Sequence, residues 1–399
     1  MLEFFKDERV LVLQDLGEWM QPLDCWMYLP TSTTESPPSL ETCGSVGTRL
    51  GRFLASVHCN TTLLSESQKL TDDGKLWFEN PDTKDLTRDK IMGRVLPILQ
   101  PWNDIETGRT EKIAKLISQD FERSFLDVLY SPSSPSFGVP QSMFSMGDLW
   151  TGSIIVGAPP TAPSPNPSSD ALAEVNIGLI DWEFAAPTRI GQDITQLTCW
   201  LYLFSTLSAW SSAEPRCRRM AVGAVANPQM PSTAASQFGP DVGAGARHGI
   251  GVGAGGGANP VTSGTPGVQS AARTLLNALL NAYARKVKEH PDYAWFVDED
   301  HDQRRYKRER LAVIRSIWIL FGREVIFDSV EGRDWFVKCC ARGVDGGEKE
   351  EEIRLWQREM IEVGFWYVSV AGESTDEAFE EAVRKECVLK RMYTASGSL

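Results

Sequence analysis

Two acidic turns, each joined to a short apolar run, constrain the fold of this chain more than any other feature. In Ser145–Val156 a small-residue turn carries Asp148 and leads directly into an apolar run. In Ile177–Phe184 the order is reversed, because the apolar run comes first and ends at Asp181. Short β-branched apolar runs bounded by turn residues are typical of strands. The middle of the chain is therefore expected to form a β-hairpin that carries two carboxylates.

Composition limits the class of protein. A chain of 399 residues can bury a large core. The net charge of −13 argues against a nucleic-acid-binding surface, which needs basic patches. The sequence holds no run of 18 apolar residues and no apolar region for a signal peptide near Met1. We expect a cytoplasmic protein with neither a nucleic-acid nor a membrane partner, and the sequence leaves its oligomeric state open.

The cysteines point to a reducing compartment. The chain has eight cysteines and four histidines, with no Cys-x-x-Cys pair. This pattern argues against both a zinc cluster and a disulfide framework. The cysteines are Cys25, Cys43, Cys59, Cys199, Cys217, Cys339, Cys340 and Cys387.

The rest of the chain reads mainly as helices. Arg9–Leu13 predicts a buried strand, and Ser153–Val156 is expected to pair with Asn176–Ile180. In the first helix, Leu50, Phe53, Leu54, Val57 and His58 share one face. Further helices are expected at 112–130, 193–208, 275–288, 303–321, 333–340, 350–363 and 376–392.

One segment differs sharply in composition. From about 211 to 269 the chain is dominated by Gly, Ala, Ser and Pro. Such a segment buries too little apolar area to offset the entropy of ordering it, so we expect it to be disordered. The sequence predicts an α+β protein that is interrupted by this insert.

Asp148 is a candidate general base. It follows Gly147, which lets the backbone approach a ligand closely, and precedes Leu149-Trp150, which can pin the turn to the core. A carboxylate in such a place can accept the proton of an attacking hydroxyl. An aspartate that merely caps a turn is the common alternative.

Asp181 and Glu183 are candidate metal ligands. Both follow the end of the predicted second strand, and carboxylate oxygens are ligands that Mg²⁺ prefers. The alternative is a pair of acidic residues that face water. A metal hydrolase that uses the same carboxylates is weakly supported, because little histidine lies near them.

The two motifs together resemble the catalytic segment of the family that includes aminoglycoside phosphotransferases, choline kinases and methylthioribose kinases. The family pattern is His-Gly-Asp, two variable residues, Thr or Pro, Gly and then Asn. Here Met146 stands in place of His and Ser153 in place of Asn. A Thr-Gly-Ser ending is similar to that of methylthioribose kinases, and a hydroxyl can coordinate Mg²⁺. The Asp-x-Glu form of the second motif is similar to the metal motif of choline and methylthioribose kinases.

The resemblance implies a protein-kinase-like fold, mainly its helical C-terminal lobe with a catalytic hairpin. It implies transfer of the γ-phosphate of ATP to a hydroxyl of a small-molecule acceptor, with Asp148 as the base. Asp181 would bind Mg²⁺, aided by Ser153 and Glu183. The backbone of Gln14, Asp15 and Leu16, in a segment similar to the interlobe connector, would hold the adenine edge.

Two further residues match the family without an assigned chemical role. Gly191-Gln192-Asp193-Ile194 resembles a segment whose aspartate braces the catalytic loop, although a favourable position at a helix N-terminus also explains Asp193. His58 lies in a segment similar to the helix after the connector, and we expect it to pack in the core.

The strand lysine and phosphate-covering loop of kinase-like folds have no counterpart before the connector. We therefore divide the chain into residues 1–17, a remnant of the N-terminal lobe with the connector, and residues 18–399, the C-terminal lobe. The alternative to an active kinase is a catalytically impaired, pseudokinase-like binding protein or a truncated gene product. The acceptor is expected among the C-terminal helices, near an aromatic set that serves mainly in core packing. This set is Trp318, Phe321, Trp335, Trp356, Phe365 and Trp366.

Overall fold

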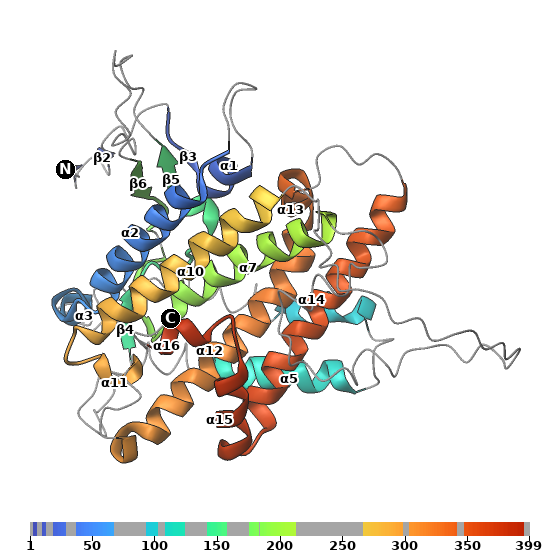
Figure 1. The fold of residues 1–399 in the computed structure, drawn as a ribbon. Helices are drawn as coiled ribbons and strands as arrows, with labels where there is room; N and C mark the ends of the chain where they lie inside the picture. The colour runs from blue at the N-terminus through green and yellow to red at the C-terminus, as the bar shows by residue number, and fades with distance from the viewer. Residues whose placement is uncertain are drawn as a thin grey trace, which may run out of the picture.

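The structure, a computed structural model, has an α+β architecture that is mostly helical (Figure 1). It describes residues 3–5, 10–12, 19–28, 37–67, 93–102, 108–123, 142–157, 175–182, 184–212, 266–297, 303–340 and 347–394. Gln14, Asp15, Leu16 and Glu183 lie outside these ranges, as does most of the Gly-rich segment. No described helix has a stretch apolar and long enough to cross a bilayer.

The helices account for most of the described chain. They are α1 (Leu23–Tyr28), α2 (Leu40–His58), α3 (Thr61–Ser67), α5 (Arg109–Phe121), α7 (Gln192–Ser212), α10 (Pro266–Lys288), α11 (Ala294–Val297), α12 (Gln303–Glu331), α13 (Arg333–Cys340), α14 (Gly347–Glu373), α15 (Asp376–Lys385) and α16 (Lys390–Tyr393). The strands are β1 (Glu3–Phe5), β2 (Val10–Val12), β3 (Gln21–Pro22), β4 (Ser142–Ser145), β5 (Ile154–Gly157), β6 (Asn176–Leu179) and β7 (Ala186–Arg189).

The predicted hairpin is confirmed. Strands β5 and β6 pair antiparallel, with Ile154 opposite Leu179, and β3 adds to the free side of β5. A separate two-stranded ribbon pairs β4 with β7, with Ser145 opposite Ala186. Strand β4 runs directly into the Gly147-Asp148 turn, so the two small sheets hold the chain on both sides of this turn.

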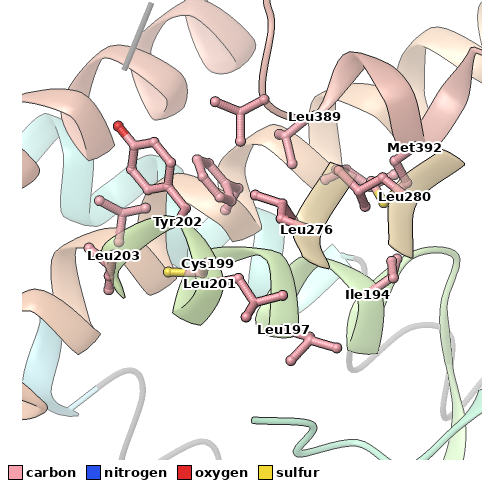
Figure 2. Close-up of a cluster of buried hydrophobic side chains, with 14 of the residues drawn as sticks. Ile194, Leu197, Cys199, Leu201, Tyr202, Leu203, Leu276, Leu280, Leu389 and Met392 are labelled. Carbon is pink, nitrogen blue, oxygen red and sulfur yellow. The ribbon is translucent and has the colours of Figure 1, made fainter. Parts of the chain in front are cut away.

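The helical part packs around α7 and α10. Helix α10 lies between α2 and α7, and α12 contacts both α7 and α14 (Figure 1). Almost every side chain of α7 up to Ala209 is buried, so α7 is a central helix of the core rather than an amphipathic surface helix. Figure 2 shows its apolar side chains facing those of α10 and the C-terminal residues Leu389 and Met392.

Several helix boundaries in the structure differ from those predicted from the sequence. Helix α12 continues to Glu331 and α14 to Glu373, and α10 already begins at Pro266, so residues 266–269 are not disordered. The single helix expected at 376–392 is broken into α15 and α16. The buried carboxylate of Glu386 causes this break, because it accepts hydrogen bonds from the backbone N–H groups of Val388, Leu389 and Lys390.

The predicted buried face of α2 is only partly correct. Leu50, Leu54 and His58 are buried as expected, but Phe53 is 47% exposed. The face that contacts α10 instead includes two glycines, Gly47 and Gly51. A Cβ at Gly47 would lie 2.4 Å from the carbonyl oxygen of Leu275, and one at Gly51 would lie 2.3 Å from that of Leu279. The helix backbones therefore touch there, which only glycine permits.

We predict opposite effects for alanine at neighbouring glycines of α2. Gly47→Ala and Gly51→Ala should each lower the free energy of unfolding by about 1–3 kcal/mol, because the new methyl group meets backbone atoms that cannot move aside. Gly44→Ala is the matched control, since its Cβ would meet only Thr274 Cγ2 at 3.7 Å. It should stabilise the protein by about 0.5–1 kcal/mol through helix propensity. Chemical denaturation measures all three, and equal effects would contradict the close helix contact.

Candidate functional site

The two acidic turns touch each other at Gly147. This glycine has a φ of 88°, in the left-handed region that favours glycine. A Cβ there would lie 2.3 Å from the carbonyl oxygen of Phe184, three residues after Asp181. Both the positive φ and the close approach of Phe184 therefore require glycine next to Asp148. The approach of Phe184 also brings the two motifs of the sequence into direct contact.

A buried carboxylate fixes the backbone of the turn that carries Asp148 through hydrogen bonds. Asp193, at the start of α7, accepts hydrogen bonds from the backbone N–H groups of Met146 (2.7 Å) and Gly147 (2.9 Å). His58 Nε2 lies 3.0 Å from the same carboxylate and donates to it. Asp193 and His58 are both fully buried. The bracing expected for Asp193 is confirmed, and His58 packs in the core as predicted while it also orients this carboxylate.

A second buried carboxylate holds the other end of the loop. Thr151 Oγ1 donates to Asp24 Oδ2 at 2.7 Å, and Trp335 Nε1 donates to the same oxygen at 2.9 Å. Asp24 is 0% exposed, so these hydrogen bonds are made away from water. Asp24 could not be predicted from the sequence, because it belongs to a short helix without a recognisable motif. The loop from 146 to 151 is thus fixed at both ends.

Ser153 closes the turn after Asp148. Its hydroxyl donates to the carbonyl oxygen of Trp150 (2.9 Å) and accepts from the Trp150 N–H (3.1 Å). Its side chain is fully buried. A hydroxyl oxygen has two lone pairs, so one remains for a cation after these contacts. The predicted role of Ser153 as a metal ligand stays a prediction.

Asp181 has an unusual backbone conformation. Its φ is 64°, and it is the sole non-glycine residue with a positive φ in the part of the chain that the structure describes. The N–H of the preceding residue, Ile180, donates a hydrogen bond to the backbone oxygen of Ser153 at 3.0 Å. Asp181 therefore directly follows a residue that is bonded to Ser153. The side chain of Asp181 is exposed. Left-handed conformations of non-glycine residues are costly and cluster at functional sites.

The structure thus brings together three of the predicted site residues. Asp148, Ser153 and Asp181 lie on the two turns that meet at Gly147. The exposed carboxylate of Asp181 and the hydroxyl of Ser153 are both hard oxygen ligands, which is the kind that Mg²⁺ prefers. Among the described residues, no three His, Cys, Asp or Glu side chains form a metal-binding group. The predicted metal ligand Glu183 and the predicted adenine contacts Gln14, Asp15 and Leu16 are outside the described residues.

A small cavity of about 280 Å³ opens beside Asp148. Three carboxylates line it, because Glu324 and Asp328 reach it from α12. Gln196 also lines it, and its side-chain oxygen has no hydrogen-bond partner. The remaining walls are Leu149, Trp150 and Trp200.

Sequence reasoning missed Glu324 and Asp328. Both follow residue 321, at which the predicted helix ended, and they belong to no recognisable motif. The core-packing role expected for most of the aromatic set is confirmed for Trp318, Phe321, Trp356 and Phe365, which are fully buried. The aromatic walls of the cavity are two other side chains, Trp150 and Trp200, whose ring centroids are 5.3 Å apart.

The acidic cavity is electrostatically unfavourable without a cation. Burial raises the pKa of Asp328 well above its ordinary value of 3.8, and the carboxylates of Glu324 and Asp148 raise it further. The Cys199 thiol donates a hydrogen bond to Asp328 at 3.6 Å, which acts in the opposite direction. Glu324 is paired with the neighbouring Arg323. A cluster of this kind favours a positively charged ligand.

The chain matches no protein-family model, and no curated protein is similar to it in sequence.

We predict that Asp328→Asn stabilises the protein at neutral pH. A carboxyl whose folded-state pKa is raised contributes stability that is present below pH 3.8 and is lost as the pH rises through the folded-state pKa. The amide does not titrate, so the variant should have the higher melting temperature at pH 7 and should match the wild type below about pH 4. Thermal unfolding from pH 3.5 to 8 measures the difference. A variant that is less stable at pH 7 would show that the ionised carboxylate is well satisfied.

We predict the opposite effect for Asp193→Asn. Both carboxylate oxygens of Asp193 accept hydrogen bonds, so either orientation of an amide places an NH₂ group against a donor. The substitution should lower the free energy of unfolding by about 3 kcal/mol, as expected for a buried charged group that loses partners. Denaturant unfolding tests this. Asp334→Asn is the control, because that side chain is 98% exposed and should have little effect.

Proposed function

We propose that this protein is a small-molecule kinase similar to the aminoglycoside phosphotransferases, with a protein-kinase-like fold. It would transfer the γ-phosphate of ATP to a hydroxyl group of an acceptor in the cytoplasm. The observation that supports this proposal is the contact of Gly147 with Phe184, because it joins the turn that bears Asp148 to the segment that follows the left-handed Asp181. Phosphoryl transfer needs a base and a metal-binding carboxylate close together, and the two turns supply one each.

Asp148 is suited to accept the proton of the acceptor hydroxyl. It is exposed toward the cavity, whereas the backbone on its N-terminal side is fixed by Asp193. The loop therefore needs no reorganisation to present the carboxylate, which is how positioned bases accelerate proton transfer. Leu149, fully buried, anchors the residue after it. The arrangement combines a fixed backbone with an exposed side chain that lines the cavity.

Asp181 and Ser153 are the described residues that would hold Mg²⁺, together with Glu183 in the same turn. When bound with ATP, Mg²⁺ neutralises charge on the phosphates. The carboxylate of Asp181 is exposed, so such a ligand can reach it, and its backbone at this position is left-handed. A metal-binding role would explain why Asp181 keeps a strained, left-handed backbone.

The cavity beside Asp148 favours an acceptor that carries a positive charge in addition to its hydroxyl. Three carboxylates line the cavity, and the unpartnered oxygen of Gln196 accepts a further hydrogen bond. The rings of Trp150 and Trp200 can contact a cation through their faces. An amino or quaternary ammonium group would relieve the repulsion among the carboxylates, which an uncharged alcohol would not.

One observation favours the alternative of a catalytically impaired binding protein. The hydroxyl of Ser153 is already committed to the backbone of Trp150 on both its donor and one acceptor side. A metal ion that depends on Ser153 would be held more weakly than one with a free side-chain ligand. In that case the protein would bind a nucleotide or a cation without turnover.

We predict that the two aspartates separate binding from turnover. ATP should raise the melting temperature of the wild type only when Mg²⁺ is present, and Asp181→Asn should abolish this Mg²⁺ dependence. Asp148→Asn should keep the thermal response but lower acceptor-dependent ADP formation by about 10²–10⁴-fold, the usual contribution of a positioned base. The acceptors to compare are hydroxyl compounds with and without an amino group.

Asp334→Asn is again the control and should behave as the wild type in both assays. Full turnover by Asp148→Asn would show that Asp148 is not the base. A Mg²⁺-dependent ATP response in the wild type without ADP formation on any acceptor would support the binding protein instead. The absence of any response to ATP would refute the kinase proposal.

A further inference from the structure

We propose that a second cavity, separate from the one beside Asp148, binds a small organic anion that also carries a hydrogen-bond donor. The cavity measures about 820 Å³, within the range of small-molecule sites. It lies among α5, α12 and the end of α14, and it shares no lining residue with the cavity beside Asp148. Its apolar wall is formed by Leu116, Ile190, Ala312, Val313 and Ile319. This inference does not depend on the proposed kinase activity.

Arg189, at the end of β7, supplies the first unused donor. Its Nε donates to Gln192 Oε1 at 3.0 Å, and its Nη1 donates to Asp120 and Ser316 at 2.5 and 2.8 Å. Its Nη2 has no hydrogen-bond partner, although the residue is only 4% exposed. A buried guanidinium nitrogen without a partner costs free energy, so an acceptor is expected at this position.

Trp295, in α11, supplies the second unused donor. It lines the same cavity and is 2% exposed, and its Nε1–H has no partner. Other indole N–H groups of the protein are satisfied, for example that of Trp318 by the Tyr393 hydroxyl and that of Trp356 by the Thr206 hydroxyl. The unpaired indole of Trp295 is therefore an exception, and it lines the same cavity as the unpaired guanidinium nitrogen of Arg189.

The charges around the cavity favour an anion. Four arginines line it against three acidic residues. Asp120 is paired with Arg189 and Asp376 with Arg315, so both of these acidic residues are already neutralised. The balance leaves the guanidinium groups of Arg123 and Arg308 against the single carboxylate of Glu309. A carboxylate or phosphate group matches this surplus and can accept from Arg189 Nη2 and Trp295 Nε1.

Glu309 adds a requirement for a donor on the ligand. Its Oε2 is buried and has no hydrogen-bond partner. A buried carboxylate oxygen needs an N–H or O–H group, which a purely anionic ligand lacks. The ligand class that satisfies all three unpaired atoms is a small hydroxylated carboxylate or phosphate ester, or an amino acid.

The test measures binding by isothermal titration calorimetry, without ATP. The probes are inorganic phosphate, acetate, lactate and glycerol 3-phosphate. We expect lactate to bind more tightly than acetate, because lactate has a hydroxyl group that can donate to Glu309, whereas the acetate anion has no donor. Trp295→Phe keeps the ring but removes the N–H, and it should weaken binding about tenfold, as one charge-assisted hydrogen bond implies.

Trp366→Phe is the matched control, since Trp366 packs on Trp318 and does not line the cavity, and it should bind as the wild type. Glu309→Gln should remove the preference for lactate over acetate. The proposal is overturned if no probe binds the wild type, or if Trp295→Phe binds as tightly as the wild type. Binding that is lost in Asp181→Asn but kept in Trp295→Phe would place the anion at the candidate active site and would likewise overturn it.

Discussion

The buried carboxylate of Asp193 is the interaction on which the rest of the site depends. It joins three parts of the structure at one point: the chain that follows β4 through Met146 and Gly147, the start of α7 on which it lies, and α2 through His58. His58 in turn contacts the hydroxyl of Tyr283 in α10 at 3.0 Å. Since a buried charge is tolerated only when its hydrogen bonds are made, these elements can be arranged in few other ways. The position of Asp148 follows from this network rather than from the local sequence of its turn.

The candidate site combines rigid and unfavourable features. Gly147 and the two buried aspartates fix the loop, whereas the left-handed backbone of Asp181 and the carboxylates around Asp328 oppose folding. A core that served stability alone would have neither a left-handed aspartate nor a group of neighbouring carboxylates. Local strain and like-charge repulsion are held in place by stronger packing elsewhere, and they are common where a ligand completes the structure. The helix contacts of α2, α10 and α7 are the source of that packing.

The parts of the structure that sequence could predict are those determined locally. The hairpin followed from apolar runs and turn residues around Ser153 and Asp181, and the motif spacing drew attention to Asp148 and Asp193. Asp24, Glu324 and Asp328 could not be found in this way, because they approach the loop from helices that are distant in sequence. The break between α15 and α16 could not be predicted either, because it depends on the hydrogen bonds of the buried carboxylate of Glu386. Periodicity placed Phe53 on the wrong side of α2, where two glycines rather than large side chains make the contact with α10.

The hydrogen bond between Asp24 and Trp335 has a consequence for the order of folding. It joins residues 311 positions apart, and the contact of His58 with Tyr283 spans 225. Contacts of such long sequence separation form late, because the entropy of closing the intervening chain must be lost first. On the ribosome, which extends a chain by about 5–20 residues per second, the loop of Asp148 would emerge well before the helices that hold it. The candidate site can therefore be completed only after Trp335 has left the ribosome, so the loop of Asp148 waits for residues made long after it.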